Sequence, residues 1–181
     1  MQRYWIALIS LLALGSFAGP RAAAAPPNIR AFDFSNATYN DFCGMGALRL
    51  QRGEYRRSAT AQSPAIEAHL VGVAFGDVLR DGATQAVVNS WCTAGGTGIF
   101  SHVSVYELKA DGLVKVFDVA SGDRSWGGVL HDPRIENGSI VVEQCLPANL
   151  CQFSKITTFR WNGKKFASIR VLKHSSGQNS P

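Results

Sequence analysis

The sequence predicts a mainly β protein, a single antiparallel β-meander or hairpin-rich domain that follows a cleaved signal peptide. Two observations lead to this fold class. Helical periodicity is hard to find after the first 24 residues, whereas short β-branched and aromatic runs recur between Gly, Asn and Asp. The remaining chain, about 157 residues, suits one domain that can bury its own core. A sandwich, an open barrel and propeller-blade-like sheets are all compatible with this pattern.

Residues 1–24 have the pattern of a secretory signal peptide. Arg3 precedes an apolar run over residues 5–18, which is shorter than the roughly twenty residues of a membrane-spanning helix. Ala22 and Ala24 fit an A-x-A signal, so cleavage is expected after Ala24, with an uncleaved anchor as the alternative. No cysteine follows closely enough for lipid attachment. We therefore expect a secreted or periplasmic protein with no membrane anchor after cleavage.

The expected strands follow one another along a domain over residues 25–174. They are residues 47–51, 54–58, 68–75, 84–91, 102–108, 113–119, 129–135, 139–144, 155–161 and 165–171. Asn162-Gly163 is the strongest hairpin signal, because both central residues of a type I′ turn need positive φ. The apolar run at residues 86–88 predicts a strand buried on both faces. A short helix is allowed near residues 35–42, and the polar tail 175–181 is expected to be disordered.

A simple meander over residues 66–172 would place successive connections at alternating ends of the sheet. The tight turns would lie at one end. The longer loops would gather at the other, and they are residues 92–101, 120–127 and 145–151. Binding residues favour loops that a rigid scaffold positions, so this loop-rich end is the predicted contact surface.

Three side chains of the loop-rich end form the predicted partner-binding patch. They are Phe100, Arg124 and Trp126. Trp and Arg are favoured anchors at protein interfaces, and glycines on both sides leave Trp126 little local bulk to shield it. The alternative for both aromatic residues is that they cap the core from a strand end.

All four cysteines lie in the exported part, where an oxidising compartment favours disulfides. Of the three possible connectivities we choose Cys145 with Cys151, because the sequence between them forms a compact loop. This choice leaves Cys43 with Cys92. A metal or redox site is the alternative, but the chain has no C-x-x-C motif and no Cys/His spacing of the zinc type.

The charge of the mature chain argues against nucleic acid as a partner. Cleavage removes Arg3 and Arg21 and leaves 16 basic against 13 acidic residues. The densest basic clusters are only Arg56-Arg57 and Lys164-Lys165, whereas nucleic-acid binders concentrate such residues on one face. No nucleic-acid binding is expected.

The segment GDVLRDGATQAVV contains an acidic turn. Asp77, Asp81 and Gly82 match the pattern D-x-D/N-x-D-G-x-x-D, whereas Leu79 and Gln85 stand where further ligands belong. In this it resembles the turn of FG-GAP or integrin-type repeats. Calcium takes six to eight oxygens, and two carboxylates with one amide fall short of that number.

Asp77 and Asp81 are therefore candidate ligands of a degenerate calcium turn, with calcium the only cofactor considered. The preferred interpretation needs no ion. In it Asp77 caps the turn through its own backbone neighbours, and Gly82 takes a positive φ.

A longer arrangement is similar to small exported bacterial proteins of uncharacterised function, and to the domain of LppP/LprE-type lipoproteins. It consists of the aromatic segment FDFSNATYNDFCG, the acidic turn followed by AVV, and GGTG-x-F before a V-Y strand. The resemblance implies export and a β-rich domain, and it supplies no established catalytic residues. The lipobox cysteine of the lipoproteins is missing here.

No residue pattern names a reaction. GGTGIFSH lacks the Lys-Ser/Thr ending of a phosphate loop, and Ser101 and His102 should point to opposite faces of a strand. The histidines and carboxylates are scattered, so no catalytic residue is assigned. We expect an exported binding or envelope-accessory protein that is not an enzyme and that contacts an unknown protein or small ligand. The alternatives are a secreted hydrolase with a spatially assembled site and a disulfide-braced enzyme inhibitor.

Overall fold

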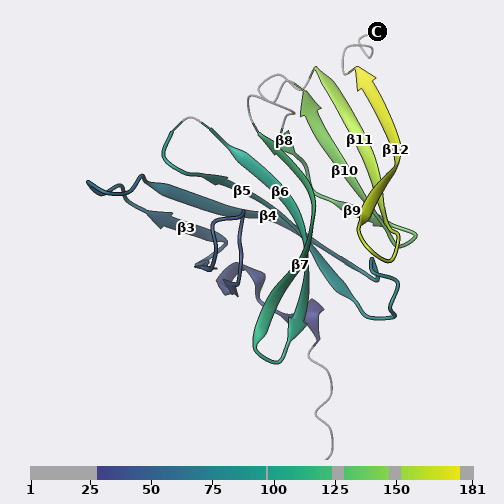
Figure 1. The fold of residues 1–181 in the computed structure, drawn as a ribbon, viewed down its shortest axis with the longest axis horizontal. Helices are drawn as coiled ribbons and strands as arrows, with labels where there is room; N and C mark the ends of the chain where they lie inside the picture. The colour runs from purple at the N-terminus through teal and green to yellow at the C-terminus, as the bar shows by residue number, and fades with distance from the viewer. Residues whose placement is uncertain (1–27, 97, 124–128, 147–151, 176–181) are drawn as a thin grey trace, which may run out of the picture.

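A computed structural model describes residues 28–96, 98–123, 129–146 and 152–175, and its fold is mainly β, as predicted (Figure 1). Two short 3-10 turns, η1 (Ile29–Ala31) and η2 (Phe34–Asn36), precede the strands. The strands are β1 (Thr38–Tyr39), β2 (Leu48–Arg49), β3 (Glu54–Arg57), β4 (Ile66–Gly76), β5 (Gln85–Thr93), β6 (Phe100–Lys109), β7 (Gly112–Asp123), β8 (Val129–Leu130), β9 (Arg134–Glu136), β10 (Ser139–Leu146), β11 (Phe153–Trp161) and β12 (Phe166–Ser175).

The strands form two sheets. The first sheet has the order β2-β1-β7-β6-β5-β4-β3, and within it β4 to β7 make an antiparallel meander. The second sheet has the order β12-β11-β10-β8, with β9 also paired to β10. The expectation of one meander from residue 66 to 172 is therefore wrong, because the chain changes sheet after β7. As a result, the second sheet covers the apolar residues on one face of β5 and β6.

Strand β5 lies between two hydrophobic clusters. Ala86, Val88 and Cys92 belong to the first cluster, whereas Val87 belongs to the second. Successive side chains of a strand point to opposite faces, so an unbroken apolar run fills both clusters at once. The prediction that residues 86–88 are buried on both faces is confirmed.

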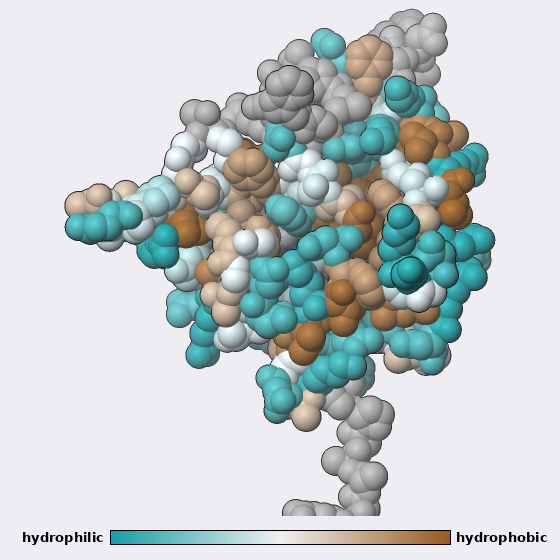
Figure 2. All heavy atoms as spheres, in the orientation of Figure 1, coloured by the Kyte–Doolittle hydropathy of each residue, from teal (hydrophilic) through white to brown (hydrophobic). Residues whose placement is uncertain are grey.

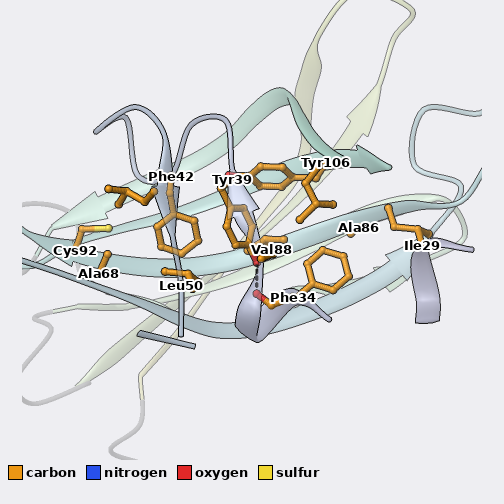
Figure 3. Packing of buried hydrophobic residues seen from close by; sticks show 13 residues of the cluster. Ile29, Phe34, Tyr39, Phe42, Leu50, Ala68, Ala86, Val88, Cys92 and Tyr106 are labelled. Atoms are coloured by element: carbon orange, nitrogen blue, oxygen red, sulfur yellow. Dashed lines mark hydrogen bonds between the residues drawn. The ribbon is translucent and has the colours of Figure 1, made fainter. Parts of the chain in front are cut away.

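The N-terminal segment closes the first cluster over one face of the first sheet (Figure 3). Tyr39 packs edge-on against Phe42 at 4.7 Å and against Tyr106 at 5.3 Å between ring centroids. The Tyr39 hydroxyl donates to the Phe34 carbonyl at 2.9 Å, and the Tyr106 hydroxyl donates to the Asp41 carbonyl at 2.6 Å. Burial raises the pKa of both tyrosines, so these hydroxyls stay protonated and keep donating.

The second cluster joins the two sheets. Its fully buried members are Val78, Val87, Val103, Val105, Leu130, Ile140 and Val142. At one margin of the cluster, Phe117 of β7 packs against Trp161 of β11 with 4.4 Å between ring centroids. The core is thus two apolar layers with the first sheet between them.

The hairpin turns only partly follow the sequence prediction. Asn137 and Gly138 both have positive φ, at 49° and 68°, and Glu136 pairs with Ser139 across this two-residue turn. Asn162-Gly163, the turn with the strongest sequence signal, behaves differently. Of these two residues only Gly163 has positive φ.

The loop between β11 and β12 is four residues long, because Trp161 pairs with Phe166. The Asn162 side-chain oxygen accepts the backbone N–H groups of Lys164 at 3.0 Å and Lys165 at 2.9 Å. This Asx-type arrangement competes with a type I′ turn and explains why that prediction is wrong.

The helix allowed near residues 35–42 is also absent from the described chain. The Asp33 carboxylate accepts the Ser35 N–H at 3.1 Å and caps one 3-10 turn, which ends at Asn36. Tyr39 then pairs in β1 with Leu48. The extended backbone lets the side chains of Phe34 and Tyr39 both reach the first cluster.

A disulfide joins Cys43 to Cys92, as predicted, with 6.4 Å between the Cα atoms and a sequence separation of 49. It fixes the N-terminal segment to the end of β5. The second predicted pair, Cys145–Cys151, involves a residue outside the described ranges. The expected signal peptide and residues 176–181 of the expected tail also lie outside them, whereas Ser175 ends β12. In the part of the chain that the structure describes, no helix has the length and apolar character to cross a bilayer.

Replacing both Cys43 and Cys92 by alanine should lower the free energy of unfolding by about 4 kcal/mol, since the bridge closes a loop of this size in the unfolded chain. Urea unfolding monitored by circular dichroism measures the change. A matched control is the oxidised protein treated with reductant. An effect near zero would contradict the view that this bridge holds the N-terminal cover of the first cluster in place.

Candidate functional site

A buried amide side chain lies at the seam between the two sheets, where β5 and β6 contact β8. Asn89 lies on β5 on the face toward the second sheet, and it is completely buried. Its side-chain nitrogen donates to the Leu130 carbonyl at 3.3 Å. Its side-chain oxygen is buried and has no hydrogen-bond partner among the described residues. A buried acceptor without a donor costs about 1 to 3 kcal/mol, which marks this position as one that a ligand or water would complete.

Ser101 of β6 binds the other backbone polar group of Leu130, its N–H. Its hydroxyl oxygen accepts a hydrogen bond from the Leu130 N–H at 3.1 Å. The same hydroxyl donates a hydrogen bond to the Gly122 carbonyl oxygen at 3.3 Å. Asn89 and Ser101 together therefore bind both polar groups of Leu130. The two-residue strand β8 is fixed against the first sheet by these contacts.

A cavity of about 240 Å³ opens beside this contact. Its lining comes from β4, β5, β6 and the segment that follows β8, namely Val71, Asn89, Ser90, Trp91, Ser101, Leu130, His131 and Asp132. A second hollow of about 420 Å³ adjoins it and shares His131 and Asp132. These two side chains therefore stand between the hollows.

An irregularity in β4 shapes the mouth of the cavity. The pairing with β5 shifts between Leu70 and Gly72, which leaves Val71 unpaired. Gly72 then faces Asp132 so closely that a Cβ atom there would lie 2.5 Å from the Asp132 carboxylate oxygen. β-Bulges commonly reposition side chains beside functional sites, and here the bulge makes room for a carboxylate at the rim.

An aromatic pair forms one wall. The ring of His69 stacks on Trp91, with 3.9 Å between centroids and 13° between planes. His69 Nδ1 lies 3.6 Å from Glu54 Oε1, and its Nε2 is buried without a hydrogen-bond partner among the described residues. The His69 ring thereby fixes the orientation of the Trp91 indole.

The sulfur of Cys145 and a backbone hydrogen bond orient His131. Its Nε2 lies 2.8 Å from Cys145 Sγ, and its backbone N–H donates to the Glu143 carbonyl at 2.8 Å. Glu143 also lines the second hollow. Asn89, Asp132 and Glu143 supply acceptor oxygens to the two hollows, and Arg134, which also lines the second hollow, lies 3.5 Å from Glu136.

The hydroxyl of Ser101 does not have the geometry of a nucleophile, since its proton is committed to a backbone carbonyl. Ser101 and His102 point to opposite faces of β6, as the sequence predicts. Ser101 reaches β8, whereas His102 lies on the side of a charged network that includes Asp118 and Lys115. The arrangement at the seam is suited to holding a ligand rather than to acyl transfer.

The charged network lies at the contact of β6, β7 and the N-terminal segment. Lys115 Nζ forms ion pairs with Asp41 and with Asp118, the latter at 3.0 Å, and Ser104 donates to Asp118 at 2.7 Å. Burial acts to raise the pKa of Asp118, but the hydrogen bonds from Ser104 and Lys115 outweigh it and lower that pKa. These groups satisfy one another, which indicates a structural ion network.

The acidic turn of the sequence analysis is held by its own backbone. Asp77 accepts the N–H groups of Asp81 and Gly82, each at 3.1 Å, and Gly82 has a φ of 84°. Asp81 accepts the Ala83 N–H at 2.9 Å and the Gln85 side-chain amide at 3.1 Å, and these bonds lower its pKa. The capping role predicted for Asp77 is confirmed.

Gln85 completes the acidic turn in the position where a calcium-binding repeat has its last acid. It is fully buried, and its side-chain oxygen accepts the N–H groups of Val78 at 3.0 Å and Leu79 at 3.3 Å. The Gln85 amide thus orders the backbone of the turn, as a bound ion would.

Of the predicted contact patch, the structure describes Phe100 alone. It begins β6, pairs with Cys92, and its side chain is 46% exposed. Arg124 and Trp126 lie outside the described residues. The seam site itself was missed from the sequence. Its signal was the polar pair Asn89-Ser90 inside the buried run of β5, since a buried polar residue in an apolar strand calls for a partner.

No family model, curated protein or solved structure matches this chain. The resemblances to integrin-type repeats and to LppP/LprE-type lipoproteins therefore stay predictions.

Replacing Gln85 by alanine should lower the free energy of unfolding by about 2 kcal/mol or more, because it removes the acceptor of the N–H groups of buried Val78 and half-buried Leu79. Thr84→Ala, at the adjacent exposed position, is the control. Thermal unfolding measures both. Addition of calcium should leave the unfolding temperature of the natural chain unchanged, and a calcium-dependent rise would contradict a turn completed by Gln85.

The pH dependence of stability should contain a contribution from His102. Burial, the largest influence, lowers its pKa below the ordinary value near 6.5, so the unfolded chain binds this proton more readily than the folded one. Stability should therefore be lost as pH falls from about 6.5 through the lower folded pKa. Urea midpoints across this range should fall less in His102→Asn than in His174→Asn, which alters an exposed histidine. Identical slopes would contradict the burial argument.

Proposed function

We propose that this chain is an exported binding protein without catalytic activity, and that it takes a small ligand at the seam between its sheets. The ligand carries hydrogen-bond donors, and a primary ammonium group fits best. The single observation that carries the proposal is the buried Asn89 oxygen with no donor partner among the described residues, beside a cavity of about 240 Å³.

The chemistry of the lining supports a cation. Asn89 and Asp132 both line the cavity, where the Asn89 oxygen can accept a hydrogen bond and the Asp132 carboxylate can accept a charge-assisted one. The indole of Trp91 can add a cation–π contact, which contributes about 0.5 to 2 kcal/mol. The three groups come from separate strands or loops, and they meet only because β8 is docked on β5 and β6.

Export is part of the same proposal. The Cys43–Cys92 bridge supports it, since disulfides persist in oxidising compartments and are rare in the cytosol. The sequence of residues 1–24 has the features of a cleaved signal peptide. Phe100, the described member of the predicted contact patch, is adjacent in sequence to Ser101, so a partner that contacts Phe100 would lie next to the seam site.

Titration with 1,4-diaminobutane and with glucose, followed by tryptophan fluorescence and thermal unfolding, tests the proposal. The diamine should bind and raise the unfolding temperature. Asp132→Asn should lower the affinity for the diamine by roughly tenfold or more, because a hydrogen bond to a charged group contributes about 1.5 to 3 kcal/mol. Asp111→Asn, an exposed turn residue, is the matched control and should bind normally.

A third variant separates shape from charge. Val71→Trp should close the mouth of the cavity and abolish binding while the fold persists, because Val71 is unpaired and 46% exposed. Glucose binding that is insensitive to Asp132→Asn would favour a neutral polyol instead of an amine. Absence of binding by either probe at millimolar concentration would refute the proposal.

A further inference from the structure

The charge of the chain is divided along the sequence. Its last acidic residue is Glu143, and from there to the end the chain has six basic residues and no acidic one. Up to Glu143 it has 12 basic and 13 acidic residues. The whole net charge of +5 therefore comes from the C-terminal part of the chain. Searching for adjacent basic residues misses this feature, because the cations are spaced along two strands.

The fold gathers these cations on one hairpin at the margin of the molecule. They are Lys155 and Arg160 of β11, Lys164 and Lys165 of the connecting loop, and Arg170 and Lys173 of β12. β12 is the outer strand of the second sheet. None of the six forms an ion pair with a described residue. Lys155 donates to Gln144 at 3.4 Å and Arg160 donates to Ser139 at 3.1 Å.

The register of the hairpin sets two of these cations against each other. Lys155 and Lys173 are direct partners across β11 and β12. Like charges in directly opposed positions destabilise an antiparallel pair. The cost is offset when an anion lies between them, so this pair points to a negatively charged partner.

Exposed apolar side chains lie on the same hairpin. Phe153 and Val171 are 52% and 50% exposed, and each stands two residues from one of the opposed lysines. Ile169, which is unpaired at the register shift of β12, is also 50% exposed. In Figure 2 the surface over β12, at the right, shows hydrophobic and hydrophilic residues side by side. Two strands thus combine unpaired cations with large side chains that remain in water.

We propose that the β11–β12 hairpin binds the surface of an anionic lipid bilayer. Lysine and arginine near such a surface are attracted by its negative potential, and exposed aromatic and aliphatic side chains enter the interface between headgroups and acyl chains. The lipid phosphates lie against Lys155 and Lys173, whereas Phe153 and Val171 beside them supply the apolar contact. The binding is peripheral and reversible. It goes beyond the proposed seam site and does not depend on it.

Protection of the sheet edge explains less. Charged residues on an outer strand prevent pairing with other sheets, which accounts for Arg170 and Lys173. It does not account for Lys164 and Lys165 in the loop. Nor does it explain apolar residues on the same strand, which would favour the contact that the charges prevent. A soluble polyanion would use the cations but gain nothing from Phe153.

Flotation with vesicles tests the proposal on the protein purified after export of the full chain. The vesicles are pure phosphatidylcholine or phosphatidylcholine mixed with phosphatidylglycerol. The natural chain should bind the mixed vesicles only, less strongly as salt rises. Lys155→Gln with Lys173→Gln should weaken partitioning roughly 30-fold and flatten the salt dependence, given the attraction expected for each lysine near an anionic surface. The same variant should unfold at an equal or higher urea concentration, because the opposed charges are gone.

Two further variants separate the contributions. Arg49→Gln with Arg57→Gln changes the net charge by the same amount at exposed positions of β2 and β3, and it should bind as the natural chain does. Phe153→Thr with Val171→Thr should weaken binding and leave the salt dependence unchanged.

Three results would overturn the proposal. The first is equal loss of binding in the β2–β3 control, which would mean that net charge alone matters. The second is equal binding to both vesicle types. The third is binding to dextran sulfate without binding to mixed vesicles, which would assign the hairpin to a soluble polyanion.

Discussion

The structure depends on one contact, in which Asn89 and Ser101 bind the two backbone polar groups of Leu130. The two side chains reach from β5 and β6 to the short strand β8, and they occupy its N–H and its carbonyl oxygen. Without this contact, the segment that enters the second sheet after β7 would be held by the two-residue strand β8. With it, the apolar faces of Val87, Val103 and Val105 gain a covering layer. Asn89 also lines the cavity beside this contact, so the joint between the sheets and the candidate binding site are one feature.

Much of the fold could be predicted because local chemistry determines it. Strand β5 was predictable since its unbroken apolar run must be buried on both sides, and Asn137-Gly138 forms a tight turn in the expected place. The bridge of Cys43 and Cys92 was predicted because pairing Cys145 with Cys151 across a compact loop leaves these two cysteines. These features depend on residues that lie close in sequence or on simple pairing rules.

Other features depend on contacts that sequence cannot rank. Asn162-Gly163 has the composition of a type I′ turn, but the Asn162 side chain binds two backbone N–H groups and lengthens the loop. The chain changes sheet after β7 so that apolar residues of β5 and β6 pack against those of β10. The periodicity of a strand shows that it has an apolar face but not which other strand covers that face. Asn89 was identifiable as polar within a buried strand, yet its partner lies 41 residues away in β8. The cavity exists only once both strands are in place.

The two candidate surfaces have opposite electrostatic character. The seam is lined by Asp132 and Glu143, and the one described cation there, Arg134, lies 3.5 Å from Glu136. The outer hairpin holds six cations and none of the acids. A chain with this division can hold a cationic ligand at the seam while the outer hairpin is in contact with an anionic surface, because each site excludes the partner of the other. Modest net charge thus conceals two strongly polarised regions.

Native-state hydrogen exchange at the Leu130 amide tests the contact between the sheets most directly. The account predicts that this amide, although in a strand of two residues, exchanges as slowly as the amides of β5, because Ser101 accepts its proton inside the seam. In Ser101→Ala the protection should be lost at Leu130 and kept at Val87. An amide at Leu130 that exchanges in the natural chain as fast as an exposed loop would contradict the account.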